Sequence, residues 1–352
     1  MPKLTKILIK PALQCFHRCR HCEPRQNYYR DLVNKNDASQ MPLEMAERFI
    51  KEAYFLGMEE CLISGGDPLL YPHLRELVKY AGSFEGVSVY INSSGHNLTE
   101  QYAYDLLTAG LNSMHISLDS PYAEKHNHLR GIDNAWENSV NTIDILTGMK
   151  RSNPSFSKFI VQLNTVITRH NYMDIPELVD LALRKRVDSI YLMNVYGDIG
   201  NLFLLSTQQI EEFRNRIIPE VLKVLNKSGT GNLVVENAEE VLHSFFSKEY
   251  NTIENYAEGI YWSEAEAAKR ACNIPDYWAL LEPDGSILPC CMMEISEGKI
   301  AGNFKSKSLA DIWTGDAYEA FRRDKLEYCK ACPIVYNKTL GLVPEMCKQM
   351  KY

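Results

Sequence analysis

Short apolar runs alternate with longer amphipathic stretches along the first two thirds of the chain. The short runs end in polar or glycine-containing segments and predict buried strands at 7–13, 61–64, 87–91, 114–118, 159–168 and 189–195. The stretches between and after them have the apolar spacing of helices, at 43–56, 72–81, 99–109, 135–150, 175–184 and 207–225. Strands and helices in alternation predict a parallel sheet with right-handed crossovers.

Six such strand–helix units are too few to close an eight-unit barrel. The expected fold is therefore α/β, a partial (β/α)6 TIM-like barrel. In such folds the functional groups gather at the carboxyl ends of the strands. Polar, glycine-rich or cysteine-rich segments follow the predicted strands at 15–22, 65–68, 92–95 and 119. Their shared position predicts a site at this edge of the sheet.

Composition and charge exclude several classes of protein. The chain has 352 residues, of which 45% are hydrophobic and 24% charged, as in ordinary globular proteins. Its net charge of −7 argues against a nucleic-acid partner. No apolar run reaches the ~18 residues of a membrane span, and the N-terminus lacks the apolar segment of a signal peptide. We therefore expect a cytoplasmic protein with no membrane partner.

The cysteines form two groups with a single residue, Cys61, between them. The groups are Cys15, Cys19 and Cys22, and Cys272, Cys290, Cys291, Cys329, Cys332 and Cys347. In a reducing cytoplasm, clustered cysteines indicate a metal, an iron–sulfur cluster or catalysis rather than disulfides. The expected domains are a core at 1–200, a core-completing and linker or substrate region at 201–271, and a small β-hairpin/helix domain with the second cysteine group at 272–352.

The N-terminal group has the spacing C-x3-C-x2-C. Thiolates of Cys15, Cys19 and Cys22 can hold three irons of a [4Fe–4S] cluster and leave the fourth iron open. An open metal position is what a catalyst needs, because a ligand can bind there. The alternative is a structural zinc site completed by His17 or His21, although zinc motifs usually supply two well-separated pairs of ligands.

The C-terminal group is expected to close a second site. Two pairs of thiols would converge, Cys272 with Cys290 across a hairpin, and Cys329 with Cys332 in a C-x2-C knuckle after a predicted helix at 309–325. Asp284-Gly285 is the turn signal of that hairpin. Four thiols suit an auxiliary iron–sulfur cluster or a zinc ion. Cys347 is either a substitute ligand or a spare thiol.

The cysteine spacing and the strand-end segments resemble the radical S-adenosylmethionine (radical SAM) superfamily over about residues 7–200. Ser64-Gly65-Gly66-Asp67-Pro68 resembles its Gly-Gly-Glu-Pro loop, with Asp in place of Glu. By this resemblance the loop contacts the methionyl amino group, and an arginine lies near the methionyl carboxylate. The residues implied in cofactor binding are Gly65, Gly66, Asp67, Pro68, Asn92, Ser117, Asp119, Arg130 and Asn164.

Some of these positions also have ordinary structural explanations. Ser117 and Asp119 would serve equally as strand-end caps. Asn164 would serve as a core amide, and Arg130 as a surface charge.

The resemblance also implies the chemistry and the cofactors. These are S-adenosyl-L-methionine, a core [4Fe–4S] cluster held by the N-terminal cysteines, and an electron donor of the flavodoxin or ferredoxin type. The cluster would reduce S-adenosylmethionine to a 5′-deoxyadenosyl radical, which takes hydrogen from a substrate C–H. The last quarter resembles the SPASM/twitch extension and is closer to the twitch form with one auxiliary [4Fe–4S] cluster. The expected ligands of that cluster are Cys272, Cys290, Cys329 and Cys332.

Two cysteines fall outside the expected ligand sets. Cys61 begins a predicted buried strand and is expected to be a small core residue. Cys291 follows the proposed ligand Cys290, and along a strand its side chain points to the opposite side. It is a candidate hydrogen-atom donor for an epimerase, and the alternative is an inert buried cysteine or a spare ligand.

The substrate is left between several classes. A ribosomal peptide that is epimerised, oxidised or cross-linked is the leading hypothesis, and an amino sugar or aminocyclitol is the alternative. The fourteen residues before Cys15 are too few for the N-terminal peptide-recognition domain of many peptide-modifying relatives, which weakens the peptide hypothesis. Modification of a protein partner stays open, whereas a non-catalytic iron–sulfur carrier would have no use for loops that contact S-adenosylmethionine.

Overall fold

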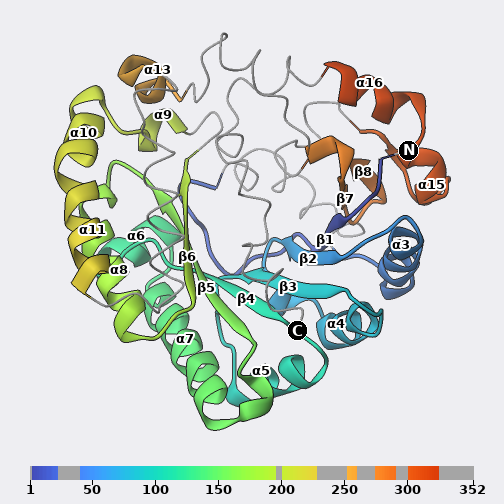
Figure 1. The fold of residues 1–352 in the computed structure, drawn as a ribbon, viewed down its shortest axis with the longest axis horizontal. Helices are drawn as coiled ribbons and strands as arrows, with labels where there is room; N and C mark the ends of the chain where they lie inside the picture. Colours follow the sequence, from blue (N-terminus) through green and yellow to red (C-terminus); the bar gives the residue numbers. More distant parts are fainter. Residues whose placement is uncertain are drawn as a thin grey trace. The chain divides into compact units, whose positions relative to one another are not determined.

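The computed structural model describes residues 2–22, 40–195, 200–227, 252–259, 274–290 and 300–324. These residues belong to two compact units, whose elements are labelled in Figure 1. The first unit takes them from Met1–Arg18, Pro24–His115 and Cys272–Lys325. The second takes them from Cys19–Glu23, Ile116–Ala271 and Leu326–Tyr352.

A mixed sheet forms the centre of the first unit, in the order β3-β2-β1-β7-β8-β9. The strands are β1 Lys6–Ala12, β2 Glu60–Gly65, β3 Ser88–Ser93, β7 Trp278–Leu281, β8 Ser286–Leu288 and β9 Gly302–Asn303. The first four of these in space, β3, β2, β1 and β7, run parallel, whereas β8 and β9 are antiparallel. This arrangement confirms the predicted α/β class, and the β7–β8 pairing confirms the hairpin at Asp284-Gly285.

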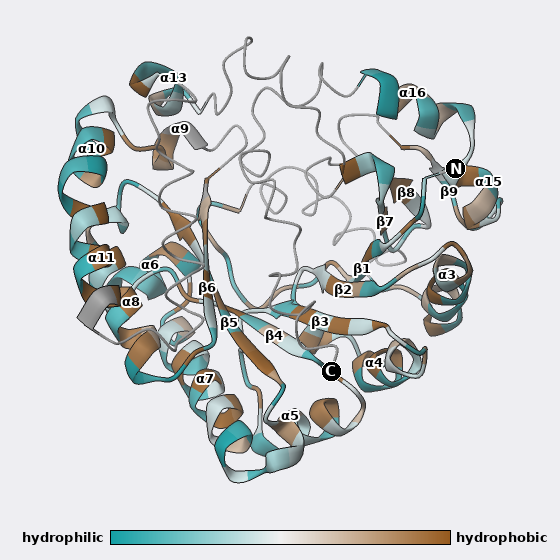
Figure 2. Ribbon diagram, in the orientation of Figure 1, coloured by the Kyte–Doolittle hydropathy of each residue, from teal (hydrophilic) through white to brown (hydrophobic). Residues whose placement is uncertain are grey.

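The helices of the first unit bury one side each. They are α3 Leu43–Phe55, α4 Leu74–Gly82, α5 Glu100–Thr108, α15 Leu309–Trp313 and α16 Asp316–Asp324. In α3 the buried residues Ala46, Phe49, Ile50 and Ala53 recur at helical spacing, and Figure 2 shows mixed hydropathy around this helix. The predicted start of α5 is confirmed, because the Thr99 hydroxyl accepts a hydrogen bond from Tyr102 N at 3.2 Å.

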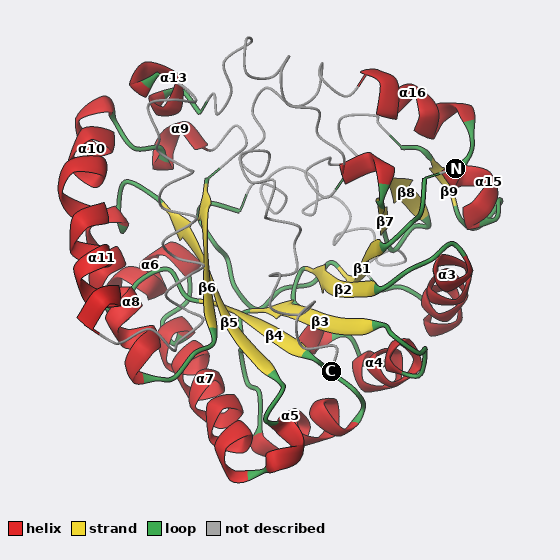
Figure 3. Ribbon diagram, in the orientation of Figure 1, coloured by secondary structure: helices red, strands yellow, loops and turns green. Residues whose placement is uncertain are grey.

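The second unit continues the pattern of parallel strands and helices. Strand β4 Ser113–Ser117 leads into it, and β5 Ile160–Ile167 pairs in parallel with β6 Ser189–Asn194. Its helices, shown in red in Figure 3, are α6 Ala123–Arg130, α7 Ala135–Ser152, α8 Ile175–Arg184, α9 Gly200–Phe203, α10 Thr207–Glu212, α11 Ile218–Lys227 and α13 Ile253–Ala257. Within the described ranges, none of the helices has the length and apolar character needed to cross a membrane.

Three helical segments differ from the sequence prediction. The helix expected at 207–225 contains a π-helical turn, Phe213–Ile217, between α10 and α11. Pro219 explains this, because proline has no N–H to continue the regular ladder. The helix expected at 309–325 is divided into α15 and α16 near Gly315. Helix α6 was not predicted, since its sequence is mostly polar.

Buried ion pairs join neighbouring strands of the first unit. On β1, Lys6 lies opposite Glu60 of β2, and their charged atoms are 2.9 Å apart. Two pleats further on, Lys10 Nζ lies 2.6 Å from Glu282 Oε1, just beyond the end of β7. The Lys10 and Glu282 side chains are only 9% and 0% exposed. Strand β7, from the last quarter of the sequence, is therefore tied to the first strand by backbone pairing and by buried charge.

Gly66 allows the segment after β2 to lie against the segment after β1. Its N–H donates to Ala12 O at 2.9 Å, and Asp67 N donates to Gln14 O at 2.7 Å. A Cβ at position 66 would stand only 2.0 Å from Gln14 O and 2.5 Å from Leu13 O. The residue leading into Cys15 thus occupies the space that a side chain at 66 would need.

We expect Gly66→Ala to destabilise the protein by roughly 1–3 kcal/mol, since the added methyl group meets backbone that cannot rotate away. The matched control is Gly148→Ala in α7, where no packed neighbour lies within 4 Å of the place that the new methyl group would take. That change should stabilise the helix by roughly 0.5–1 kcal/mol. Chemical denaturation measures both. Equal free energies of unfolding for Gly66→Ala and the wild type would contradict the close approach.

We also expect Glu282→Gln to lower the free energy of unfolding by roughly 3–5 kcal/mol, because it leaves the buried Lys10 ammonium facing a neutral amide. The control is Glu59→Gln, which alters the exposed pair of Lys3 and Glu59, 2.7 Å apart. An exposed pair contributes only about 0–1 kcal/mol. Denaturation curves that shift equally for the two variants would show that the Lys10–Glu282 pair contributes no more than a surface contact.

Candidate functional site

The N-terminal cysteines are divided between the two units. In the first unit, Cys15 follows β1 and is half-buried. In the second unit, Cys19 is buried and Cys22 is half-buried. The loop that carries them is held by its backbone, since Arg20 N donates to Leu129 O of α6 at 2.9 Å. This contact fixes the segment Cys19–Cys22, the cysteine loop of the second unit, against α6.

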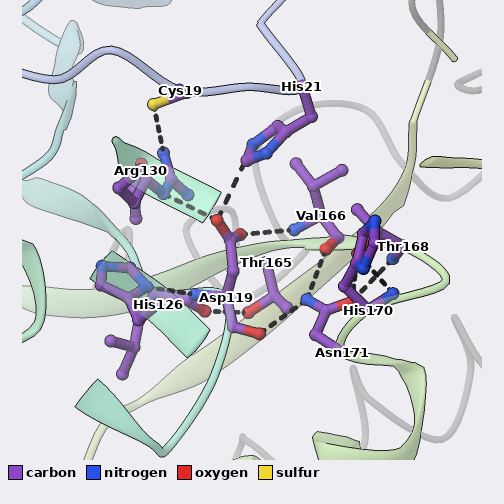
Figure 4. Close-up of polar contacts among 12 residues, drawn as sticks. Cys19, His21, Asp119, His126, Arg130, Thr165, Val166, Thr168, His170 and Asn171 are labelled. Carbon is purple, nitrogen blue, oxygen red and sulfur yellow. Dashed lines mark hydrogen bonds and ion pairs between the residues drawn. The ribbon is translucent and has the colours of Figure 1, made fainter. Parts of the chain in front are cut away.

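Asp119 is the centre of a buried polar network in the second unit (Figure 4). Its side chain is fully buried, and Oδ1 accepts a hydrogen bond from Val166 N at 3.0 Å. Its other oxygen, Oδ2, lies 2.7 Å from Arg130 Nε and 3.7 Å from His21 Nε2. The Asp119 backbone N–H donates to His126 Nδ1 at 3.0 Å. Asp119 is thereby fixed through both its side chain and its backbone.

Asp119 and Arg130 are the charged residues of this network, whereas its two histidines are neutral. Burial is the largest influence on the pKa of Asp119 and would raise it, but Arg130, the two histidines and the hydrogen bond from Val166 N together hold that pKa below its usual value. Burial lowers the pKa of His21 to about 4 and that of His126 to about 3, although Asp119 works in the opposite direction. Both imidazoles are therefore neutral at physiological pH, and Asp119 and Arg130 form the ion pair.

Arg130 connects this ion pair to the cysteine loop. Its Nη1 donates a hydrogen bond to Cys19 Sγ at 3.7 Å, while its Nε faces Asp119. Arg130 is 8% exposed, which excludes the alternative that it is a surface charge. A buried guanidinium beside a cysteine favours the thiolate, the form that binds metal. The surroundings of Cys19 therefore suit a metal ligand.

Asp67 plays a structural part at the ends of β2 and β3. Its carboxyl group is 1% exposed and accepts hydrogen bonds from Ser93 Oγ at 2.8 Å, Leu69 N at 3.1 Å and Ser94 N at 3.1 Å, with a further bond from Ser94 Oγ. Burial raises the pKa of Asp67, and these hydrogen bonds partly offset the effect. Asp67 thus joins the loop after β2 to the loop after β3.

The other predicted cofactor-binding residues of the first unit lie beside Asp67. Gly65 has φ +121° and packs against Ala12 O, which a Cβ would approach to 2.5 Å. Pro68 begins the 3-10 turn η1 Pro68–Leu70. The Oδ1 atom of Asn92 is buried without a hydrogen-bond partner among the described residues. It is an acceptor available to a ligand with an N–H or O–H group.

The remaining predicted residues of the second unit make ordinary contacts. Ser117 O accepts from Ser139 Oγ at 3.1 Å. Asn164 O accepts from Leu118 N at 3.0 Å, and Asn164 Oδ1 accepts from Gln162 Nε2 at 2.8 Å. Asn164 therefore has the contacts of a core amide on its Oδ1 side. Its binding to a cofactor stays a prediction.

Sequence reasoning missed several residues that support Asp119. Asn171 Nδ2 donates to Asp119 O at 2.6 Å and to Val166 O at 2.8 Å, as Figure 4 shows. His126 was missed because α6 was not predicted. His21 was considered only as a zinc ligand, although it directly precedes Cys22 in the cysteine loop. No sequence signal marks Asn171, because its contribution is a hydrogen bond to the backbone carbonyl of Asp119, which is distant in the sequence.

Of the C-terminal cysteines, Cys290 lies among the described residues. It follows β8, is buried, and lies close enough to Tyr318 to help raise the pKa of that phenol, an effect dominated by burial. Five cysteines lie outside the described residues: Cys272, Cys291, Cys329, Cys332 and Cys347. Cys61 is completely buried and burial raises the pKa of its thiol to about 12, which confirms it as an inert core residue.

Proteins of known identity resemble this chain over most of its length. It is 23% identical to the AdoMet-dependent heme synthase of Methanosarcina barkeri, over 92% of this chain and 86% of the relative. It is 26% identical to the PqqA peptide cyclase of Xanthomonas campestris, over 81% of this chain and 69% of the relative. Its fold matches SuiB of Streptococcus suis bound to S-adenosylmethionine, with a TM-score of 0.64 at 18% identity, over 92% of this chain and 68% of SuiB.

Two sequence families match the segments that contain most of the cysteines. The Radical SAM superfamily matches residues 9–182, which contain Cys15, Cys19 and Cys22. The iron–sulfur cluster-binding SPASM domain matches residues 272–333, which contain Cys272, Cys290, Cys329 and Cys332. The chain therefore belongs to the radical SAM superfamily and carries a C-terminal SPASM domain.

Proposed function

We propose that this protein is a radical SAM enzyme that abstracts hydrogen from a substrate C–H bond in natural-product biosynthesis or maturation. The observation that carries the proposal is the pairing of a radical SAM core with an iron–sulfur domain in one chain. The cofactors are S-adenosylmethionine and iron–sulfur clusters, and when bound they supply a 5′-deoxyadenosyl radical. The protein's task is to hold them and to position the target carbon.

Cys15, Cys19 and Cys22 are the proposed ligands of the core cluster. The hydrogen bond from Arg130 to Cys19 supports this assignment, because it favours a thiolate in a buried position. The backbone packing at Gly66 supports it too, since it fixes the segment that leads into Cys15. Three cysteine ligands would leave one iron free for S-adenosylmethionine.

The proposed contacts of S-adenosylmethionine lie within or just after strands, except Arg130 at the end of α6: Gly65, Gly66, Asp67, Pro68, Asn92, Ser117, Asp119, Arg130 and Asn164. Asn92 has the clearest support, because its buried Oδ1 has an unused acceptor position among the described residues. The carboxyl groups of Asp67 and Asp119 are engaged by protein donors. We therefore propose that these two residues act by fixing their loops rather than through their side-chain oxygens.

Four cysteines are the proposed ligands of one auxiliary [4Fe–4S] cluster: Cys272, Cys290, Cys329 and Cys332. All four fall within the matched SPASM segment. Burial of Cys290 is consistent with a ligand in a protected position. An electron donor of the flavodoxin or ferredoxin type remains part of the proposal, and the cytoplasm remains the proposed compartment.

A peptide is the leading proposed substrate, with epimerisation or oxidation as its modification. The relative named PqqA peptide cyclase supports a peptide, and SuiB, which shares the fold, has been described with its precursor peptide SuiA. The heme synthase relative shows that similar sequences also act on other substrates. An amino sugar or aminocyclitol, or a side chain of a protein partner, is therefore the alternative. Incubating the reduced enzyme with members of each class and measuring 5′-deoxyadenosine above the substrate-free rate decides among them.

Anaerobically reconstituted protein should contain about eight irons per chain, as two four-iron clusters. Replacing Cys15, Cys19 and Cys22 together by Ala should leave about four irons and abolish formation of 5′-deoxyadenosine, because the core cluster is lost. Cys61→Ala is the control and should keep all the iron. Iron analysis and chromatography of the products measure these outcomes. Stoichiometric zinc in place of the second cluster would overturn the auxiliary-cluster assignment.

Cys291 is the proposed hydrogen-atom donor if the enzyme inverts a stereocentre. Thiol hydrogens exchange with solvent, so turnover in D2O should place a deuterium at the inverted centre, detectable by mass spectrometry. Cys291→Ala should keep both clusters and still form 5′-deoxyadenosine but stop inversion, and Cys347→Ala is the comparison. An oxidised product without solvent deuterium, unchanged by the loss of Cys291, would instead identify a dehydrogenase or cross-linking enzyme.

A further inference from the structure

We propose that Arg130 raises the reduction potential of the core cluster by donating a hydrogen bond to Cys19, and that Asp119 positions Arg130 for this task. The inference rests on the proposed role of Cys19 as a cluster ligand. It assigns to the Asp119–Arg130 pair a function beyond folding. Arg130 is here a positioning residue that acts on the cluster through a ligand.

The geometry divides the guanidinium between two partners. Arg130 Nε lies 2.7 Å from Asp119 Oδ2, and Arg130 Nη1 lies 3.7 Å from Cys19 Sγ (Figure 4). The planar fork of arginine makes this double contact possible, because its N–H groups point in different fixed directions. A lysine ammonium is a compact charge and could not serve both partners in the same way.

Asp119 holds the guanidinium in a fixed orientation. Its own position is set by Val166 N at Oδ1, by Asn171 Nδ2 at its backbone oxygen, and by His126 Nδ1 at its backbone N–H. Helix α6 carries Arg130 at its last residue, and Gly131 ends the helix with φ +70°. The position of Asp119 and the end of helix α6 together determine where the Arg130 guanidinium meets Cys19.

A hydrogen bond to a cluster thiolate changes the energy of the two redox states unequally. Reduction adds negative charge to the cluster, and a cationic donor at the sulfur stabilises that charge. The Asp119 carboxylate keeps the pair neutral overall, so the effect is local and directional. Removing the donor without changing the net charge should therefore make the cluster harder to reduce.

Two variants remove the donor while keeping the pair electrically neutral. Arg130→Lys keeps a cation for Asp119 but loses the fork that reaches Cys19. The double variant Asp119→Asn/Arg130→Met removes both charges and the donor, so it leaves no unpaired charge in the interior. In each, we expect the equilibrium constant for one-electron reduction of the core cluster to fall about tenfold, a shift of about 59 mV to more negative potential.

An exposed pair on α8 provides matched controls. Arg184 Nε lies 2.9 Å from Asp180 Oδ2, and both side chains are exposed. Arg184→Lys and the double variant Asp180→Asn/Arg184→Met make the same chemical changes on the surface and should leave the potential unchanged. The auxiliary cluster of each protein is an internal reference, because its potential should not move.

The measurement is a redox titration followed by electron paramagnetic resonance, without S-adenosylmethionine. The core cluster is identified separately as the signal that changes when S-adenosylmethionine is added. Omitting that ligand separates the proposed effect from any contact of Arg130 with the methionyl carboxylate. Iron analysis confirms that each variant is loaded, and if Arg130→Lys loses the core cluster, the neutral double variant decides the outcome.

A core-cluster potential equal to that of the wild type in a loaded variant would overturn the proposal, and so would a shift to more positive values. Cys19→Ala tests the assumption beneath it. If that protein still binds the core cluster, the ligand assignment is wrong, and the tuning proposal falls with it. Loss of the core cluster in Cys19→Ala instead supports the ligand assignment. If the two Arg130 variants then keep the wild-type potential of the core cluster, only the tuning proposal fails.

Discussion

A buried ion pair, Asp119 with Arg130, connects Cys19 of the second unit to the ends of its strands. Asp119 is fully buried, and a carboxylate in such a place must be neutralised and hydrogen-bonded. Arg130 supplies the neutralising charge and extends to Cys19, while Val166 and Asn171 satisfy the rest of the aspartate. The ends of β4 and β5, helix α6 and the cysteine loop consequently depend on one another, because each supplies a member of the same network.

Buried carboxylates at the strand ends of the first unit are stabilised in other ways. Among the described residues, hydroxyl and backbone N–H groups donate to Asp67, and burial raises its pKa in spite of these hydrogen bonds. Glu282 instead takes Lys10 as its partner. Buried ion pairs seldom add stability over well-packed apolar residues, whereas removing one partner is costly. The value of these buried carboxylates here is positional, since Asp67 joins two loops and the Lys10–Glu282 pair joins the first strand to the segment after β7.

The sequence predicted elements well where a local pattern determines them. The bounds of α8 and the cap of α5 agree with prediction, because apolar spacing and Thr99 act within a few residues. Helix α6 was missed because its buried residues are largely polar, and their burial depends on Asp119. The π-helical turn before Pro219 was missed although proline was visible in the sequence.

The candidate site shows the same limit. Asp119, Arg130 and Gly66 were identified through family resemblance, which preserves position along the chain. Their contacts were not, because the neighbours are distant in sequence: Gly66 packs on the Leu13–Gln14 backbone, and Arg130 pairs with Asp119 through an unpredicted helix. Resemblance thus proposed these residues as cofactor contacts, whereas only three-dimensional packing showed that the two aspartates hold loops together.

Relatives with similar sequences are named for different products. One is named a heme synthase and another a peptide cyclase, although both resemble this chain over most of its length. Because the cofactors supply the radical, the protein selects a product by deciding which C–H bond is presented and what happens to the carbon radical. The buried Asp119–Arg130 pair holds the guanidinium that donates to Cys19 in a fixed orientation. Under the proposed role of Cys19 as a cluster ligand, this network would serve the step common to all substrates, and the choice of substrate would depend on other residues.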